Sequence, residues 1–406
     1  CGYVHEGDAP PDECPQCGAG PDLFERSEAS PKQAASAQAT TTPSSADPLK
    51  DYLSAWRRET DEAEPKFAAI QHLATTGSSE IAAMRTRRTF PGWETILFKG
   101  GQLDRPPLNE EEPVDTRTII GKTAKQPLEL AVPFYVSHMS FGALSREAKI
   151  ALARGSKRAG TAIASGEGGM LPEERAEAGL YLYEIGTAAY TYNEEAIRQA
   201  DAVEIKIGQA AKPGMGGHLP KEKISEEIAR IRGVPRDRDA LCPARPYYLK
   251  SPGDLGGMVG TLRTLNGGKP VGIKIAAGHV EADLARVLEA DPDFITIDCR
   301  GGGTGAAPVF VKDNVCLPPI FALHRARRCL DAAGSQATLC VTGGFRDASD
   351  IAKALAMGAD AVALATASLI AIGCQQYRVC HTGKCPVGIT TQDPALRERL
   401  DPELSA

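Results

Sequence analysis

The sequence has few aromatic residues, no strong excess of one charge and no apolar run suited to a membrane. Aromatic residues make up 5% of the 406 residues, and 46 Lys and Arg face 52 Asp and Glu, which gives a formal charge of −6. This balance offers no electrostatic reason to expect binding to nucleic acid or to an anionic membrane. The longest apolar stretch, residues 357–374, contains Asp360 and favours a strand and a turn over a membrane span. No secretory signal is visible, so we expect a cytoplasmic protein.

Cysteine, by contrast, is abundant and unevenly placed. Six of the 11 cysteines form two dense groups, namely Cys1, Cys14 and Cys17, and then Cys374, Cys380 and Cys385. The other five lie mostly in apolar segments, where they predict small buried core residues: Cys242, Cys299, Cys316, Cys329 and Cys340. Clustered thiols in a chain without a secretory signal indicate metal binding in a reducing compartment and argue against a disulfide scaffold.

The composition divides the chain into five segments. Residues 1–26 form a small module rich in Cys, Gly and Pro, and residues 27–48 predict a flexible linker because they contain almost no large apolar side chain. Residues 49–127 predict a helical and then irregular extension. A barrel domain over residues 128–372 and a cysteine loop with a tail over residues 373–406 complete the chain.

Short, continuously apolar runs alternate with helical segments from Leu128 to Ala367. Seven runs predict strands: AVPFYVS, TAIAS, ADAVEIKIG, PVGIKIA, DFITIDC, TLCVTGG and AVALATA. Continuous apolar runs are typical of strands buried on both faces of a parallel sheet. Helices are predicted between them, for example over residues 145–158, 194–200, 280–290 and 347–357. Seven or eight such units, with no doubly wound signature, predict an α/β protein built on a (β/α)₈ barrel.

The N-terminal module carries a metal-binding knuckle. Cys14 and Cys17 are three residues apart and are followed by Gly18, which allows the turn around a metal. Cys1 matches the second half of another knuckle, whose first cysteine we expect upstream. Over residues 1–24 the module resembles the rubredoxin-like iron domain of rubrerythrins, which implies iron bound by these three cysteines. Zinc-ribbon proteins use the same spacing, so structural zinc stays the alternative.

The C-terminal cysteines are spaced differently. Cys374, Cys380 and Cys385 follow the pattern C-x₅-C-x₄-C and precede a proline, which suits a cluster loop better than a zinc ribbon. Three ligands without a fourth nearby indicate a cluster one iron short of a cube. The run GCQQYRVCHTGKCPVGITTQ resembles the 3Fe-4S loop of glutamate synthases and implies that cluster. His381 is either a hydrogen-bond donor to cluster sulfur or a surface histidine.

The resemblance extends over roughly residues 80–400. HMSFGALSREAKIALARGSKRAGTAIASGEGG, KIGQAAKPGMGGHLPKEKIS and CRGGGTGAAP are similar to consecutive segments of the glutamate synthase barrel. The sequence contains neither the glutaminase domain nor the β-helix of the large family enzyme, which favours the stand-alone, archaeal-type form. A related subunit of N-methylglutamate synthase has a similar barrel but lacks these cluster cysteines.

The same segments predict a site for flavin mononucleotide (FMN). Barrels of this kind bind phosphate after strands 7 and 8, where Gly343-Gly344 and Ala365-Thr366 lie. The resemblance implies further flavin contacts, from Gln209 after strand 3 and from Lys274 on strand 4 among others. The complete cofactor-binding prediction is Met139, Ser140, Ser165, Gln209, Lys274, Gly302, Gly303, Thr304, Gly305, Gly343, Gly344, Ala365 and Thr366.

Lys274, Gln209 and Glu167 are the predicted catalytic residues. A lysine inside the apolar run VGIKIA costs too much to bury without a role, so Lys274 is expected to offset the negative charge of reduced flavin or to bind a substrate carboxylate. Glu167 is either a proton relay or a helix cap. The resemblance implies substrate contacts from Gly168, Gly169, Met170, Lys212, His218 and Arg232. A solvated charge at a helix end is the alternative for Arg232.

Four positions depart from the family pattern. Met170 stands where the family has Glu, His218 where it has Gln, and Ala365 where Gly is usual, while residues 244–248 read ARPYY. Because the loop, Met170 and His218 are expected near the substrate, they predict weak activity on plain 2-iminoglutarate.

These predictions together describe an iron–sulfur flavoprotein oxidoreductase. Electrons from a donor protein or reductase would pass through the N-terminal iron and the 3Fe-4S cluster to FMN, which would reduce a C=N or similar group of a small carboxylated amine or oxo-acid. An N-methylglutamate synthase-type component, another FMN oxidoreductase and an electron-transfer subunit without turnover are the alternatives. We also expect a homo-oligomer and a possible glutaminase-type partner, but no nucleic acid. Hydroxy-acid oxidase activity is disfavoured because the His-Gly-Gly-Arg loop of those enzymes is missing.

Overall fold

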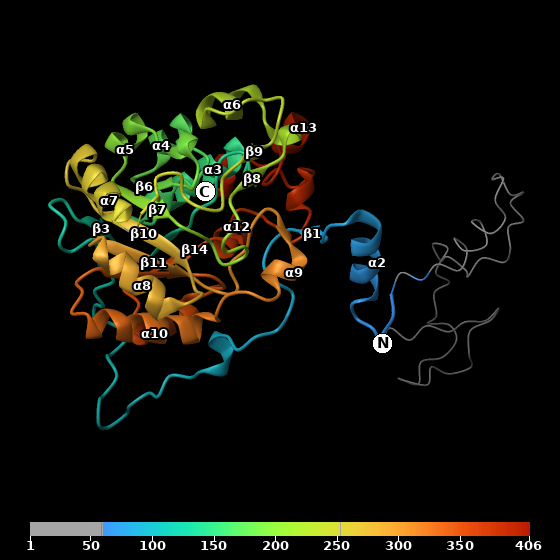
Figure 1. The fold of residues 1–406 in the computed structure, drawn as a ribbon. Helices are drawn as coiled ribbons and strands as arrows, with labels where there is room; N and C mark the ends of the chain where they lie inside the picture. Colours follow the sequence, from blue (N-terminus) through green and yellow to red (C-terminus); the bar gives the residue numbers. More distant parts are fainter. Residues whose placement is uncertain (1–57, 59, 252) are drawn as a thin grey trace, which may run out of the picture. The chain divides into compact units, whose positions relative to one another are not determined.

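A computed structural model describes residues 58, 60–251 and 253–406 of the chain (Figure 1). Contacts within the chain divide it into a unit of residues 1–68 and a unit of residues 69–406. The predicted metal module with Cys1, Cys14 and Cys17 and the predicted linker lie outside the described residues. The second unit contains the barrel and everything discussed below.

Eight parallel strands close into a barrel, as the alternating pattern predicts. In chain order these strands are β4 (Phe134–Val136), β5 (Ala162–Ala164), β6 (Leu180–Ile185), β7 (Ala202–Lys206), β10 (Val271–Ala276), β11 (Phe294–Asp298), β13 (Thr338–Thr342) and β14 (Ala361–Leu364). Each strand pairs in parallel with the next, and β14 pairs with β4 to close the ring. The (β/α)₈ prediction is therefore confirmed.

The strand β6, of sequence LYLYEI, is absent from the seven apolar runs. Its two tyrosines and Glu184 interrupt the apolar pattern, yet Tyr181, Tyr183 and Glu184 are all buried. The missed strand shifts the numbering of those that follow. Gln209 therefore lies after the fourth barrel strand and Lys274 on the fifth, so the predicted third and fourth positions are wrong.

Helices surround the barrel (Figure 1). They are α3 (Arg146–Arg158), α4 (Pro172–Glu177), α5 (Glu194–Gln199), α7 (Asp254–Leu265), α8 (Val280–Glu289), α10 (Pro319–Ala332), α11 (Ala348–Ala356) and α12 (Thr366–Ala371). The four helical segments predicted above correspond to α3, α5, α8 and α11. Three of them begin at capping side chains, since Ser145, Asn193 and Asp347 accept hydrogen bonds from the amides of Ala148, Ala196 and Asp350, respectively.

Shorter elements complete the described chain. The antiparallel hairpin of β2 (Thr118–Ile120) and β3 (Leu128–Leu130) packs Ile120, Leu128 and Leu130 in one cluster with residues of the barrel strands. The remaining elements are α2 (Phe67–Thr76), β1 (Ile81–Ala82), η2 (Trp93–Thr95), η3 (Ala189–Thr191), β8 (His218–Leu219), η4 (Lys221–Lys223), α6 (Glu226–Arg232), β9 (Ala240–Leu241), β12 (Ala307–Pro308), α9 (Val309–Lys312), η5 (Cys380–Thr382), α13 (Pro394–Arg397) and α14 (Pro402–Ser405). The extension is largely irregular between η2 and β2, as predicted.

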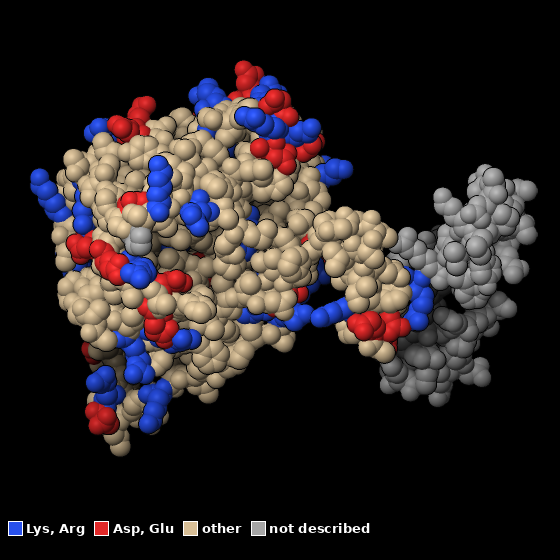
Figure 2. Space-filling view, viewed as in Figure 1, with Lys and Arg blue, Asp and Glu red and all other residues tan. Residues whose placement is uncertain are grey.

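The distribution of surface charge and the lengths of the apolar helices agree with the composition. On the face shown in Figure 2, Lys and Arg are interspersed with Asp and Glu. Within the described part of the chain, no helix combines the length and the apolar composition that a bilayer crossing requires. The apolar stretch at residues 357–374 contributes β14 and α12 instead.

Candidate functional site

Two adjoining cavities lie at the carboxyl ends of the barrel strands. We call them the Met139 cavity, whose lining includes Met139, Arg232 and Cys380, and the Lys274 cavity, whose lining includes Lys274 and Gly343. They share seven lining residues: His138, Glu184, Lys206, Gln209, Gly303, Ala365 and Thr366. The carboxyl ends of the strands are where barrels of this kind carry their active sites.

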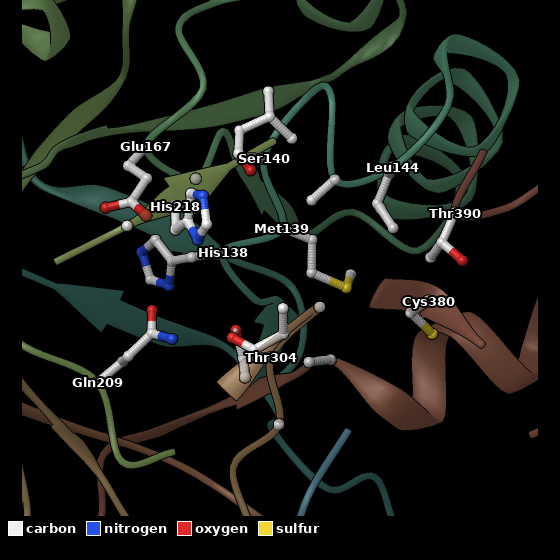
Figure 3. Close-up of a pocket in the computed structure, with 18 of the residues that line it drawn as sticks. His138, Met139, Ser140, Leu144, Glu167, Gln209, His218, Thr304, Cys380 and Thr390 are labelled. Carbon is white, nitrogen blue, oxygen red and sulfur yellow. Dashed lines mark hydrogen bonds between the residues drawn. The ribbon is translucent and has the colours of Figure 1, made fainter. Parts of the chain in front are cut away.

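The structure brings most of the predicted site residues together. The predicted cofactor-binding residues that line one or both cavities are Met139, Ser140, Gln209, Lys274, Gly302, Gly303, Thr304, Gly305, Gly343, Gly344, Ala365 and Thr366. Glu167, Lys212, His218 and Arg232 also line the Met139 cavity. Figure 3 shows Glu167 and His218 on one side of this cavity and Cys380 on the other, with Met139 between them.

Four of the residues predicted to bind cofactor or substrate line neither cavity. Ser165 is buried and accepts a hydrogen bond from the Glu184 amide. Gly168 and Gly169 pack against neighbouring backbone, since a Cβ on either would lie 2.8 Å from the carbonyl oxygen of Phe141 or Ile231, respectively. Met170 packs against the hydrophobic core. The substrate contact predicted for Met170 therefore has no support from the cavity lining.

Buried ion pairs connect the walls of the two cavities. Lys206 Nζ lies 2.9 Å from Glu167 Oε2, and Lys274 forms an ion pair with Glu184. His138 Nε2 lies 2.7 Å from Glu204 Oε2. These groups come from, or closely follow, five barrel strands: His138 follows β4, Glu167 follows β5, Glu184 lies on β6, Glu204 and Lys206 lie on β7, and Lys274 lies on β10. The closed barrel is what gathers them.

The charges in this network support one another. Burial opposes the ionisation of Glu184, but Lys274, His138 and Lys206 outweigh it and lower the pKa of Glu184 to about 2. Burial likewise opposes charge on Lys206, but Glu167 and Glu184 raise the pKa of its ammonium group well above the ordinary value. Lys206 and Glu184 are consequently both charged at neutral pH, and their positions are set before any ligand binds.

Two of the open alternatives are resolved by these contacts. The helix that follows Glu167 has Leu171 as its N-cap, without a side-chain capping bond, so a capping role for Glu167 is wrong. Arg232 is only 5% exposed and donates hydrogen bonds to the Phe141 carbonyl and, at 2.9 Å, to Ser140 Oγ. A solvated helix-end charge is therefore wrong for Arg232.

Several residues in or beside the cavity walls were missed by reasoning from the sequence. Glu204 and Lys206 lie within the apolar run ADAVEIKIG, where the argument used for Lys274 would have found them. His138 immediately precedes Met139 and carried no separate signal. Met84 lines the Met139 cavity from the extension, and its amide donates to the Thr304 carbonyl at 2.8 Å. Nothing in the sequence of the extension indicated that contact.

The ligand atoms of His138, Glu184 and Glu204 lie as close together as those of a metal site. Among the described residues they are the group whose three ligand atoms lie within 4.8 Å of one another. Lys274 Nζ bonds Glu184 and lies 3.9 Å from Glu204, so an ammonium group already occupies the position of a counter-ion. The arrangement favours a salt-bridge network over a cation site.

The cysteine loop borders the Met139 cavity. Cys380 and His381 line this cavity, and Gln376 Nε2 lies 3.3 Å from Cys374 Sγ. Burial acts to raise the pKa of Cys385, but hydrogen bonds from the Thr390, Val387 and Ile389 region outweigh it and lower that pKa. Such bonds stabilise a thiolate, which is the form that binds iron. His381 is half-buried in the wall of the Met139 cavity.

The burial of the five scattered cysteines agrees in part with the prediction. Cys242, Cys299 and Cys340 are buried, whereas Cys316 and Cys329 are half-buried, and all five are free thiols. Cys242 additionally lines the Met139 cavity, where its Sγ lies 3.0 Å from Tyr190 Oη. The prediction of buried residues is thus confirmed for three of the five.

The predicted phosphate loops differ in what their backbone requires. Gly343 has φ +108°, and a Cβ there would lie 2.3 Å from the Cys299 carbonyl oxygen, so only glycine fits. Ala365 has φ −105°, a region open to any residue. This explains why alanine can stand at the position where the family usually has glycine.

Comparison with known proteins places these features in a family. Residues 80–406 match the conserved region in glutamate synthase, and residues 1–25 match the rubredoxin-like domain of rubrerythrin. The glutamate synthase large subunit-like protein of Rhizobium meliloti (strain 1021) is 38% identical over 357 residues, which cover 83% of this chain and 81% of that protein. The archaeal-type glutamate synthase [NADPH] of Thermotoga neapolitana is 38% identical over 362 residues, covering 83% and 71% of the two chains.

Solved structures agree on the barrel. A mutant of the active chimera of (S)-mandelate dehydrogenase superposes with a TM-score of 0.50 at 14% identity, over 71% of this chain and 80% of that one. At this identity the similarity shows the fold alone. Together with the match over residues 80–406, the comparisons confirm both resemblances drawn from the sequence, and the chain belongs to the glutamate synthase family.

Proposed function

We propose that this protein is an oxidoreductase that uses FMN and a 3Fe-4S cluster to reduce a C=N group of a small carboxylated substrate. The observation that carries the proposal is the meeting of three features at one place. The glycine loops, the cysteine loop and a set of buried cations all border the two adjoining cavities. The family assignment and the names of the relatives support this reading.

The residues present fit FMN. Gly343 and Gly344 have positive φ and line the Lys274 cavity together with Arg346. The glycine backbone and the Arg346 guanidinium group offer donors for a phosphate. Lys274, on β10, and Gln209, in the loop after β7, line the same cavity. When bound, the flavin supplies the hydride. The chain's own part is to hold the phosphate and keep the lysine charge fixed beside the ring.

The residues present also fit an iron–sulfur cluster. Cys374, Cys380 and Cys385 are a set of three soft thiol ligands, and the hydrogen bonds that lower the pKa of Cys385 suit a thiolate. A cluster held there would store and pass on single electrons. Since Cys380 lines the Met139 cavity, a ligand of the cluster borders the space proposed for flavin and substrate. The N-terminal module is proposed to hold iron, with zinc as the alternative.

Lys212 and Arg232 are proposed to bind substrate carboxylates. Both side chains are buried in the wall of the Met139 cavity, and neither forms a salt bridge with another described residue. Burial lowers the pKa of the Lys212 ammonium, so a bound carboxylate would be strongly favoured as its partner. Lys206, kept protonated by Glu167, presents a hydrogen-bond donor to the same space.

Of the alternatives, an N-methylglutamate synthase-type component is less well supported because the sequence of that barrel lacks the three cysteines. An electron-transfer subunit without turnover is an outcome that the test below separates. An external electron donor, a glutaminase-type subunit and self-association stay predictions.

The test uses the full chain purified without oxygen. Flavin and cluster absorption are recorded, the flavin is reduced, and 2-oxoglutarate with ammonia, or a series of larger oxo-acids and amines, is added. Reoxidation of flavin with formation of an amino acid is expected for at least one pair, and Lys212→Met should raise KM for it at least tenfold. Lys221→Met, on the exposed turn η4, is the matched control. Stable flavin and cluster without turnover on any pair would instead favour the electron-transfer subunit.

A further inference from the structure

A buried lysine lies directly beneath two of the loops that line the Met139 cavity. Lys149, on α3, is 1% exposed, and its Nζ donates hydrogen bonds to the Met139 carbonyl at 2.6 Å and to the Ser165 carbonyl at 3.1 Å. Its third partner is Glu174 Oε1 at 2.7 Å, from α4. The ammonium group thus donates to two carbonyl oxygens, and the carboxylate of Glu174 supplies the opposite charge beside it.

The two carbonyl groups belong to neighbouring barrel strands. Met139 follows β4 and Ser165 follows β5, and the loops that continue from them are stacked on each other. A Cβ on Gly166 would lie 2.5 Å from the Ser140 amide nitrogen, which shows how closely the loops approach. Lys149 therefore joins the ends of the first two barrel strands at the cavity.

Glu174 is in turn fixed by few groups. It is fully buried, and Tyr181 Oη on β6 donates to its Oε2 at 3.1 Å. The ion pairs of the other charged residues on α3 and α4 do not include Glu174. They are Arg146 with Glu173 and Glu227, Glu147 with Arg397, Arg154 with Glu177 and Glu403, Arg158 with Glu403, and Arg175 with Asp201. Lys149 is thus the ionic partner of Glu174 within the described residues.

We propose that Lys149 and Glu174 are positioning residues that couple the geometry of the cavity to protonation. Lys149 holds the two loops together. The protonation state of Glu174 sets how strongly Lys149 is held in place. Neither residue touches the cavity space, and neither is a catalytic residue. The inference goes beyond the proposed function, and only its flavin readout rests on that function.

The titration of Glu174 falls in an accessible range. Burial raises its pKa to about 7 against the opposing effects of Lys149 and Tyr181. Because the folded state then holds this proton more tightly than the unfolded state, stability falls as pH rises from about 4.5 to about 7 and levels off above that. The ion pair with Lys149 is complete only on the alkaline side.

The test compares Glu174→Gln with Glu177→Gln in the full chain. Glu177 lies on the same helix and forms an exposed pair with Arg154 at 2.8 Å, so it controls for the loss of a carboxylate from α4. The circular dichroism of bound flavin and the urea midpoint of unfolding are measured from pH 5.5 to 8.5. We expect an inflection near pH 7 in the wild type and in Glu177→Gln, and its loss in Glu174→Gln.

A second pair of variants addresses Lys149 itself. Lys149→Arg should change the affinity for flavin by no more than a few-fold. Lys149→Met should weaken that affinity about tenfold or more, because a small displacement of the two loops is enough to lose their contacts with the flavin. An inflection that persists in Glu174→Gln, or a wild type without one, would overturn the inference. If the purified chain holds no flavin, the proposed function fails, and the pH profile of the urea midpoint alone decides the inference by the same criterion.

Discussion

Lys206 Nζ and Glu167 Oε2 lie 2.9 Å apart, at the point where the end of β7 meets the loop after β5. Lys206 projects from a strand of the barrel, whereas Glu167 belongs to the glycine-rich GEGG loop. The pair fixes that loop against the barrel and leaves both groups charged at the cavity wall. Most of the predictions below follow from contacts of this kind, which join segments that are distant in the sequence.

Removing the lysine of this pair should lower the stability of the fold, and part of that loss should depend on the presence of Glu167. Lys206→Met leaves Glu167 and Glu184 buried without one of their cations, and we expect a loss of about 3 to 5 kcal/mol in the free energy of unfolding. Glu167→Gln combined with Lys206→Met should lose less than the sum of the two single variants. Urea unfolding of the four proteins measures the coupling. Strict additivity would contradict an interaction between these side chains.

Replacement of a cysteine in the loop should remove the cluster but leave the barrel folded. In Cys380→Ser we expect the electron paramagnetic resonance signal of an oxidised 3Fe-4S centre to disappear, because each thiolate holds one iron. Cys329→Ser, on α10 and far along the chain from the loop, is the control and should keep the signal. A full signal in Cys380→Ser would show that the ligand assignment is wrong.

A methyl group at Gly343 should disturb the predicted phosphate loop. The new Cβ would lie 2.3 Å from the Cys299 carbonyl oxygen, and the backbone has φ +108°, so Gly343→Ala should cost about 2 kcal/mol or more in stability. Its flavin content after purification should fall as well. Gly257→Ala, at an exposed position of α7 with nothing within 4 Å of the added carbon, should instead be neutral or stabilising by up to about 1 kcal/mol. Equal behaviour of the two variants would argue against a strained loop.

Two departures from the family pattern should have unequal effects on substrate choice. His218 lines the Met139 cavity, where its Nε2 lies 2.6 Å from Asp239 Oδ2, whereas Met170 packs into the core. We therefore expect His218→Gln to change kcat/KM for 2-oxoglutarate with ammonia by about tenfold or more. Met170→Glu should mainly destabilise the fold by burying a charge. Restored glutamate formation in Met170→Glu alone would show that the loop at residue 170 moves to face the substrate.

Local sequence was sufficient wherever one segment carries the whole signal. The continuous apolar run VGIKIA predicts a strand buried on both faces, which the structure confirms, because the pattern depends on residues close together in the chain. The glycine at residue 343 was found for the same reason. The cluster loop, predicted from the spacing of Cys374, Cys380 and Cys385, stays a prediction. Strand β6 was not predicted because Tyr181, Tyr183 and Glu184 interrupt its apolar pattern. Their burial depends on partners contributed by other segments.

The sequence by itself thus determined the barrel and the family, and most of the cofactor- and substrate-binding residues that it predicted line the cavities. Only the tertiary structure decided which charges meet, since Glu184, Glu204, Lys206 and Lys274 lie on three different strands and His138 follows a fourth. It also decided that Met84 reaches the cavity and that Met170 does not. The physical reason is that closing a barrel brings the carboxyl ends of all its strands to one place. The direction of each side chain at that place depends on packing between segments, which no local pattern records.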